Sequence, residues 1–214
     1  MIALVDLHIS NIGSIRHALS RAGGTGIKTA TVDTISRASA VVIPGVGSFG
    51  DGMVSLREQG LIEPIRIAAK NGVPVFGICL GMQLLASESE EHGRHEGIGL
   101  IEGQVIRLAP SQPGFRVPNI GWCDVRVTRP GYLFESAAGG CFYHVHSFHL
   151  VPKDHSAVVA TIDYGGQQVV VAVEQGNIAG VQFHPEKSQD DGLDLLAGFF
   201  RRSSAGVLYQ GQSI

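Results

Sequence analysis

The sequence predicts an α/β fold with a central, mostly parallel mixed sheet, helices on both faces, and extra antiparallel strands in the C-terminal half. Two observations lead to this prediction. In the first 90 residues, short apolar runs alternate with amphipathic segments of helical length, as in strand–helix–strand units. Further along, short apolar runs follow one another with glycine and proline between them, as in antiparallel strands. The continuous apolar strands also indicate a sheet that is covered on both sides.

The N-terminal half supplies the strand–helix alternation. We expect strands at residues 2–5, 38–43 and 73–78, and helices at residues 11–22, 51–71 and 80–87. In the first helix Ile12, Ile15 and Leu19 share one face, and the glycine at position 23 ends it. We expect the second helix to break near Gly60.

The C-terminal half reads as strands followed by one helix. We expect strands at residues 103–108, 123–127, 141–150, 157–162, 167–173 and 178–183, and a closing helix at residues 190–203. Gly165-Gly166 stands between two of these runs and predicts a hairpin turn. Because no repeat, charge block or low-complexity linker interrupts the chain, we expect residues 1–214 to form a single domain.

Composition narrows the class of protein. With 44% hydrophobic and 16% charged residues, the 214-residue chain can bury a core, which excludes a disordered chain. A net charge of −3 gives no indication of a nucleic-acid partner. The apolar runs are too short to cross a membrane, and the first residues do not resemble a secretory signal. Three cysteines do not form a disulfide framework, so we expect a reducing, cytoplasmic location.

The most specific motif is Gly77-Ile78-Cys79-Leu80-Gly81, where a buried strand is followed directly by a helix. This Gly-x-Cys-x-Gly pattern is the cysteine form of a nucleophile elbow. The two glycines permit a tight turn, which holds the cysteine out at the carboxyl end of the sheet. Amide groups at the start of the following helix favour a thiolate there. The sequence therefore predicts that Cys79 is a nucleophile; a small buried cysteine at a strand end is the alternative.

A thiolate nucleophile needs a base, and the base needs a group that orients it. His184 and Glu186 follow the last apolar strand and are two residues apart. Because Pro185 favours extended backbone at the residue before it, both side chains can face the same way. With the cysteine elbow, this predicts a Cys79–His184–Glu186 triad.

A glycine-rich loop follows the strand at residues 38–43. It contains Gly45, Val46 and Gly47, at the sheet edge where such folds place ligands. Backbone amides in this loop can point at an oxyanion, and the amide of Leu80 is the natural second donor. The alternative is an ordinary strand-to-helix turn.

Taken together, the elbow followed by Gly81-Met82-Gln83, the distant His-Pro-Glu and the Pro-Gly loop resemble the class I (triad) glutamine amidotransferases. The resemblance spans residues 2–200. Three further stretches are similar to one branch of the family, the glutaminase subunits of imidazole glycerol phosphate synthases. These stretches are Gly-Ile-Gly-Leu-Ile-Glu-Gly at 97–103, Val-Pro-Asn-Ile-Gly-Trp at 117–122 and His-Pro-Glu-Lys-Ser at 184–188.

The resemblance implies an activity and a role for each matching position. L-glutamine would be hydrolysed to glutamate and ammonia, with Cys79 as nucleophile, His184 as base and Glu186 as its orienting partner. No cofactor and no metal would be needed. The oxyanion and substrate would be held by the residues of two loops and the first helix turn after the cysteine: Gly45, Val46, Gly47, Leu80, Gln83, Ser147 and Phe148.

The resemblance also implies a partner. The chain would form a heterodimer with a cyclase (synthase) barrel that uses the ammonia to make imidazole glycerol phosphate and AICAR in histidine biosynthesis. The positions expected at the interface are Asn11, Pro118, Trp122, Tyr143 and Lys187. Three places differ from the family pattern: the stretch at residues 6–11, Asn119 in place of a histidine, and Cys123 in place of an asparagine.

Four alternatives remain at this point. A paralogous glutaminase subunit could supply ammonia to a surface-sugar amidotransferase. A stand-alone cysteine peptidase or γ-glutamyl hydrolase could use the same nucleophile and base. The chain could also be an inert regulatory scaffold. Finally, Cys141, His144, His146 and His149 could hold zinc, but no paired ligand spacing accompanies them, so we expect no metal site and place His146 behind the glutamine pocket.

Overall fold

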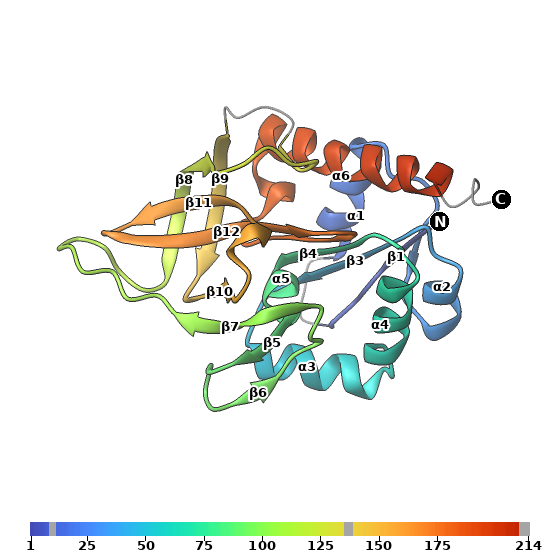
Figure 1. Ribbon diagram of the computed structural model, residues 1–214, viewed down its shortest axis with the longest axis horizontal. Coiled ribbons are helices and arrows are strands. Elements are labelled where there is room, and N and C mark those ends of the chain that lie inside the picture. Colours follow the sequence, from blue (N-terminus) through green and yellow to red (C-terminus); the bar gives the residue numbers. More distant parts are fainter. Residues whose placement is uncertain (9–11, 135–138, 210–214) are drawn as a thin grey trace.

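A computed structural model describes residues 1–8, 12–134 and 139–209, without the side chains of residues 202–209. Its main sheet has nine strands (Figure 1). In spatial order they are β2 (Ile27–Thr29), β1 (Ile2–Leu4), β3 (Ala40–Gly45), β4 (Val75–Cys79), β13 (Ile178–Val181), β12 (Gln167–Gln175), β11 (Val158–Tyr164), β8 (Asn119–Val127) and β9 (Gly140–His146). The first five strands are parallel and the last four are added antiparallel, which confirms the predicted mixed sheet.

A smaller, four-stranded sheet lies beside the antiparallel half (Figure 1). Its order is β10 (Phe148–Pro152), β7 (Ile101–Arg107), β5 (Ala86–Ser89) and β6 (His95–Glu96). The chain passes from the large sheet to the small one at Ser147, between β9 and β10. This corrects the expectation of one continuous strand at residues 141–150.

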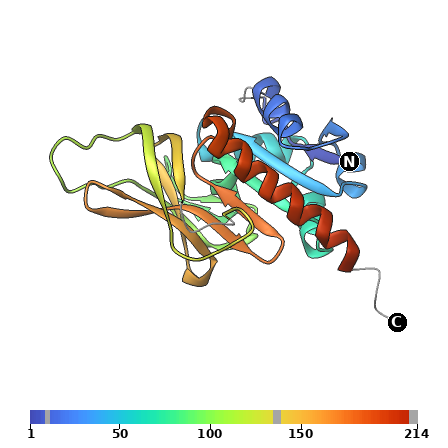
Figure 2. The ribbon, with the colours of Figure 1, turned by 90° about the horizontal axis from the view of Figure 1, so that it is seen from above.

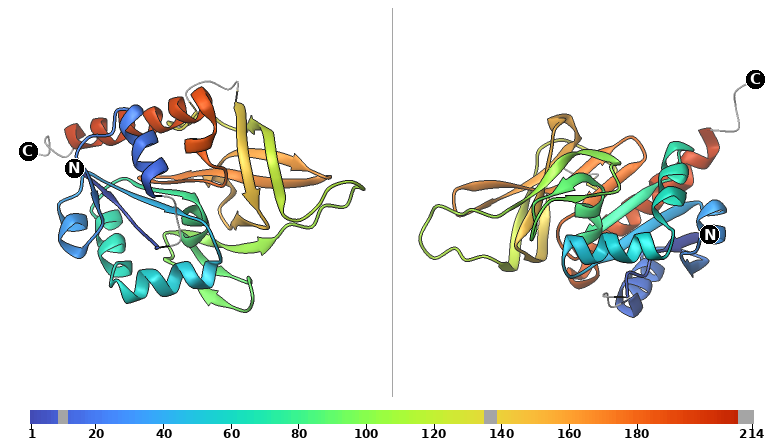
Figure 3. Two further views of the ribbon diagram at one scale, coloured as in Figure 1. Left: turned by 180° about the vertical axis from the view of Figure 1, so that it is seen from behind. Right: turned by 90° about the horizontal axis from the view of Figure 1, so that it is seen from below.

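Helices cover both faces of the parallel half (Figures 2 and 3). One face carries α1 (Ile12–Arg21) and α6 (Gln189–Tyr209), and the other carries α2 (Val32–Ser36), α3 (Phe49–Glu58), α4 (Ile62–Lys70) and α5 (Leu80–Leu84). Strand β4 shows why both faces are covered: Phe76 and Ile78 belong to the core under α1 and α6, whereas Val75 belongs to the core under α3 and α4. None of the helices in the described part of the chain is long and apolar enough to span a bilayer.

Most predicted elements are confirmed, with differences at their ends. The long helix breaks at Gly60, which has φ +65°, and yields α3 and α4. Gly165 and Gly166, both with positive φ, form the hairpin turn between β11 and β12. The helix predicted at residues 80–87 stops at Leu84, because the carbonyls of Leu84 and Leu85 accept hydrogen bonds from Ile98 and Leu100 as the chain enters β5. Strands β2, β5 and β6, helix α2 and the 3-10 turn η1 (His155–Ala157) were not predicted.

The topology brings three strand ends together. Strand β4 lies between β3 and β13, both parallel to it, with Gly45 opposite Cys79 and Val181 opposite Ile78. The loop after β3, the elbow after β4 and the segment after β13 therefore meet at one edge of the sheet. This is the carboxyl edge, where open α/β sheets bind ligands.

Candidate active site

Cys79 occupies a strained position at the end of β4. Its backbone has φ 54° and ψ −112°, which non-glycine residues seldom adopt. The two flanking glycines are sterically required. A Cβ at Gly81 would overlap the carbonyl oxygen of Ile43, and a Cβ at Gly77 would lie 2.6 Å from the backbone of Gly81. The strand–helix turn can therefore close only with glycine at both positions.

His184 and Glu186 form a buried pair at the end of the segment that follows β13. The imidazole Nδ1 of His184 donates a hydrogen bond of 2.8 Å to Oε1 of Glu186. The backbone is not extended throughout, as the sequence suggested. Only His184 is extended (φ −102°, ψ 97°), and Pro185–Lys187 form a 3-10 turn, η2. That turn, with Lys187 N–H donating to the His184 carbonyl, brings the two side chains together.

The surroundings of His184 favour its charged form. Burial alone disfavours the imidazolium. Hydrogen bonds to Cys79 and Glu186, and the charges of these two groups, outweigh burial and raise the pKa of His184 to about 10. Because Nδ1 is bonded to Glu186, the remaining ring nitrogen faces the Cys79 sulfur. An imidazolium at His184 beside the Cys79 sulfur therefore fits this geometry at neutral pH.

The main chain of β9 fixes the histidine from outside the cavity. The His184 N–H donates to the carbonyl of Tyr143 (2.9 Å), and the Tyr143 N–H donates to the Ser188 hydroxyl (3.0 Å). Ser188 in turn donates to the carbonyl of His184 (2.6 Å). The histidine is thus held by a closed set of hydrogen bonds to one strand.

A cavity of about 300 Å³ opens at Cys79 and His184. It is large enough for a small amino acid and is lined by residues from each of the converging segments: Val46, Gly47, Cys79, Leu80, Gln83, Glu91, Pro118, Val145, His146, Ser147, Phe148, His184 and Lys187. Gly45 lies behind it, packed on Leu80 at the end of β3. The structure thus brings together most of the residues predicted for the site.

The predicted oxyanion donors lie at suitable positions. Leu80 is the first residue of α5, directly after Cys79. Gly47 has φ +102° in the loop after β3, a conformation that favours glycine. Both residues line the cavity beside the cysteine.

The main-chain carbonyls of the predicted site residues Ser147 and Phe148 are already bonded within the protein. The Phe148 carbonyl accepts from Gln83 Nε2 (3.0 Å) and from His146 Nδ1 (2.9 Å), and the Ser147 carbonyl accepts from Leu108 N–H. His146 therefore stands in the cavity wall, whereas the sequence placed it behind the pocket. Burial lowers the pKa of His146 to about 4 and that of His144 to about 3, so both rings are neutral.

Two further site residues were missed from the sequence. The carboxylate of Glu91 lines the cavity and accepts a 2.7 Å hydrogen bond from the Phe49 N–H at the start of α3. It lies in the acidic stretch 88–91, which reads as a solvated loop. Gln182 is completely buried and donates from Nε2 to the Cys79 sulfur at 3.8 Å. Its place two residues before His184 was the only signal.

An exposed apolar patch adjoins the cavity mouth. Trp122 is 49% exposed and so does not belong to the core, and its ring lies edge-on to Tyr143 at 5.8 Å. Lys187 Nζ lies 5.8 Å from the centre of the Tyr143 ring. Ile120 and Val145 are also exposed on the same two strands, β8 and β9, and Pro118 lines the cavity rim. The predicted interface residue Asn11 lies outside the described residues.

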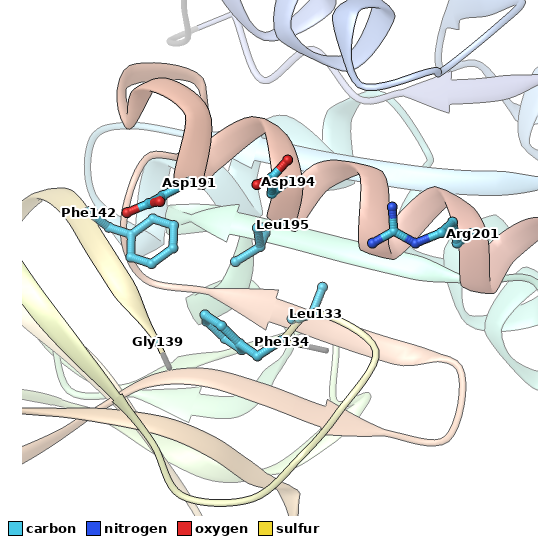
Figure 4. A pocket seen from close by; sticks show the side chains of 8 residues that line it. All are labelled: Leu133, Phe134, Gly139, Phe142, Asp191, Asp194, Leu195 and Arg201. Carbon is cyan, nitrogen blue, oxygen red and sulfur yellow. The ribbon is translucent and has the colours of Figure 1, made fainter. Parts of the chain in front are cut away.

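A larger cavity of about 490 Å³ lies elsewhere, between α6 and the strands around Phe142 (Figure 4). It is lined by Asp191, Asp194 and Arg201 together with apolar side chains. No cysteine or histidine stands among the described residues that line it, so it lacks a nucleophile and base. The predicted nucleophile and base both line the smaller cavity instead.

The fold and this cluster define an α/β enzyme class in which a cysteine on a strand–helix elbow is paired with a histidine and a carboxylate. The sequence model of one such family, Glutamine amidotransferase class-I, matches residues 3–202. This chain belongs to that family.

Curated relatives and solved structures agree with this placement. The imidazole glycerol phosphate synthase subunit HisH of Moorella thermoacetica is 45% identical over 199 residues, covering 92% of this chain and 93% of its own. HisH of Synechococcus elongatus is 41% identical over 209 residues, covering 97% and 95%. A crystal structure of a glutamine amidotransferase superimposes with TM-score 0.74 at 21% identity, covering 95% and 98%. The structure of PurLQS from Thermotoga maritima superimposes with a TM-score of 0.71 at 24% sequence identity, and the match covers 94% of this chain and 97% of that one. These two show a shared fold.

Proposed function

We propose that this chain is the glutaminase subunit of an imidazole glycerol phosphate synthase. It hydrolyses L-glutamine and passes the ammonia to a cyclase barrel partner. The observation that carries the proposal is the strained Cys79 beside the His184–Glu186 pair, in a cavity of the size of one amino acid. Relatives of 40–45% identity that bear the HisH name over more than 90% of both chains support the pathway.

The first half of the reaction forms a thioester. The Cys79 thiolate attacks the γ-carboxamide carbon of glutamine, and the carbonyl oxygen becomes an oxyanion that the amides of Gly47 and Leu80 stabilise. His184, protonated as the raised pKa indicates, gives its proton to the amide nitrogen. The C–N bond breaks, ammonia leaves, and a glutamyl thioester remains on Cys79.

The second half releases glutamate. His184, now neutral, takes a proton from water as the water oxygen attacks the thioester carbon. The C–S bond breaks when the oxyanion collapses, which restores the thiolate and the imidazolium. Glu186 accepts the hydrogen bond from Nδ1 throughout and so keeps that proton on the histidine.

Glu91 extends the substrate assignment. Glu186 is bonded to His184 and does not line the cavity, so Glu91 supplies the one carboxylate among the described residues that line it. A carboxylate complements the α-ammonium group of an amino acid. We therefore assign Glu91 and Gln83 to the α-amino end of glutamine.

The patch at the cavity mouth supports a docked partner at that face. Trp122 and Tyr143 supply aromatic surface, which is enriched in interface hot spots, and Lys187 and Pro118 stand where the patch meets the cavity. Ammonia that leaves Cys79 on this side would enter the partner directly.

The surface-sugar alternative rested on the departures at residues 6–11, Asn119 and Cys123, of which the last two lie on β8. Asn119 is buried and donates to Cys123 Sγ (3.7 Å), with His146 at 3.5 Å. Because Asn119 is buried and Cys123 is half-buried, the two residues repack the inner side of β8 instead of changing the exposed patch. This favours the histidine-pathway partner.

The test is glutamate release from L-glutamine by the purified chain, alone and with a histidine-pathway cyclase barrel and its nucleotide substrate. We expect strong stimulation by the partner and loss of turnover in Cys79→Ala, which should still bind the partner. Stimulation by a sugar-pathway barrel and not by the histidine-pathway barrel would overturn the proposed role in histidine biosynthesis. Equal turnover in Cys79→Ala would overturn the nucleophile.

We further propose that residues 1–214 form one glutaminase domain and that the protein acts in the cytoplasm. The family match over residues 3–202 supports the first proposal. Three free cysteines, one of them the proposed nucleophile, support the second. A single cooperative unfolding transition and recovery of activity in the cytosolic fraction would test them.

A further inference from the structure

Gln182 is a completely buried polar residue directly behind the nucleophile. It follows β13, and its neighbours Val181 and Phe183 point into the core under α6. Gln182 therefore points the opposite way, toward α5. Apolar side chains are the default at such a position, since a buried amide without partners destabilises the fold.

The amide of Gln182 is bonded at both ends to site residues. Its Oε1 accepts from Gln83 Nε2 at 3.0 Å, and its Nε2 donates to Cys79 Sγ at 3.8 Å. Gln83 Nε2 also donates to the Phe148 carbonyl at 3.0 Å. A continuous chain of hydrogen bonds thus runs from the Phe148 carbonyl to the sulfur.

The donor and acceptor properties of the groups determine how both side-chain amides in this series of hydrogen bonds are oriented. The Phe148 carbonyl can only accept, so the amide nitrogen of Gln83 must face it. That nitrogen donates its second proton to Gln182, so the carbonyl oxygen of Gln182 must face Gln83. The nitrogen of Gln182 is then the end that meets the sulfur. Both amides are oriented by one main-chain carbonyl.

The Cys79 sulfur also lies near a hydrogen-bond acceptor, the Val145 carbonyl, and the Gln182 N–H offsets its effect on the charge of the sulfur. The Cys79 thiol donates to the Val145 carbonyl at 3.9 Å. After ionisation that carbonyl faces a thiolate, which is repulsive, whereas an N–H from Gln182 on another side is attractive. A hydrogen bond from Gln182 therefore stabilises the thiolate relative to the thiol.

The same series of hydrogen bonds determines which atom of the Gln83 side chain is left to bind a ligand. Both protons of its amide nitrogen are used by Phe148 and Gln182. Only its carbonyl oxygen remains, and Gln83 lines the cavity. An acceptor there fits an ammonium group and not a carboxylate.

We propose that Gln182 is a further catalytic residue: it donates a hydrogen bond to the Cys79 thiolate, and it holds Gln83 with its acceptor oxygen toward the substrate's α-ammonium group. The second role rests on the proposed glutaminase function, and the first does not.

The first test measures the alkylation rate of Cys79 by iodoacetamide from pH 5 to 10, following the Cys79 peptide by mass spectrometry in the free chain. We expect Gln182→Met, of similar volume, to need a higher pH for half-maximal reactivity. The matched control is Gln168→Met, a change at an exposed glutamine on β12. Unfolding temperatures identify any variant that has lost its fold.

The second test uses steady-state glutaminase kinetics in the complex with the partner barrel. Gln182→Met removes both roles, so kcat should fall roughly 10- to 100-fold and KM should rise. Gln182→Glu keeps the acceptor for Gln83 but loses the donor to sulfur as its carboxyl ionises. Its KM should stay near the wild-type value, while its deficit in kcat grows with pH.

The outcomes separate this proposal from the proposed function. A wild-type alkylation profile in folded Gln182→Met would overturn the donor role. An equal change in KM for both variants would overturn the hold on Gln83. If the wild-type chain released no glutamate with the partner, the proposed function would fail, and the alkylation profile would still decide the donor role.

Discussion

The ionisation of one residue, His184, determines the pH range of the proposed reaction. Glu186 and Cys79 raise its pKa to about 10, so the imidazolium persists below that pH and is lost above it. Glu186→Gln removes one of these two charges. We therefore expect the alkaline limb of the kcat/KM profile to move from near pH 10 to lower pH, and kcat to fall by a factor on the order of 10² to 10⁴. An unmoved alkaline limb would contradict the pairing.

A second single residue, Trp122, allows a prediction about how tightly the partner binds. It is half exposed at the cavity mouth, so Trp122→Ala should leave the unfolding temperature nearly unchanged. Binding of the cyclase barrel should weaken by about 2 kcal/mol or more, as for other buried aromatic anchors at interfaces. Calorimetric titration gives the value. The control is Ile67→Ala on α4, an equally exposed apolar residue in a helix that covers one face of the sheet, away from the cavity. Similar losses in both variants would argue against a localised interface.

At the scale of an element, the β4–α5 elbow depends on close backbone approach. A methyl group at Gly81 would overlap the Ile43 carbonyl, and neither β3 nor α5 can move without disturbing the core. We expect Gly81→Ala to destabilise the fold by about 3 kcal/mol or more. Gly50→Ala in α3 is the control, because its methyl group would meet only the ring of His95 at 3.1 Å. Chemical denaturation of both variants tests this, and equal midpoints would refute it.

For the whole molecule, buried histidines make stability depend on pH in two directions. His144, His146 and His149 have pKa values lowered to between about 3 and 4, mainly by burial. The unfolded chain binds their protons below pH 6.5 and the folded chain does not, so stability falls as pH drops from 6.5 toward 4. His184 acts oppositely: its contribution is present below pH 6.5 and is lost as pH rises through about 10.

The measurement is the free energy of unfolding from pH 4 to 10. On the acid side we expect a slope of at most about 1.4 kcal/mol per pH unit for each of the three histidines. His144→Gln should reduce that slope, whereas His17→Gln, at an exposed position on α1, should not. A flat acid limb in the wild-type chain would mean that these rings are accessible to protons in the folded state.

The fold class could be predicted because the spacing of apolar residues, and the glycines and prolines between the apolar runs, are local features of the sequence. Buried parallel strands are continuous apolar runs, and Gly165-Gly166 can only be a tight turn. Short elements could not be predicted in this way: β2 and β6 have three and two residues, too few to show a period. The end of α5 at Leu84 and the break at Ser147 are set by hydrogen bonds to other segments of the chain, at residues 98–100 and at Leu108.

The sequence by itself determined which residues could react: a cysteine between two glycines before a helix, and a histidine followed by proline and glutamate. Their motifs are local, because steric limits on a tight turn act over a few residues. Only the tertiary structure decided that β13 lies beside β4, which places His184 and Gln182 on the sulfur of Cys79. It also added Glu91 to the cavity and buried Asn119 beneath the exposed patch. Such neighbours depend on strand order, and strand order is a property of the whole sheet.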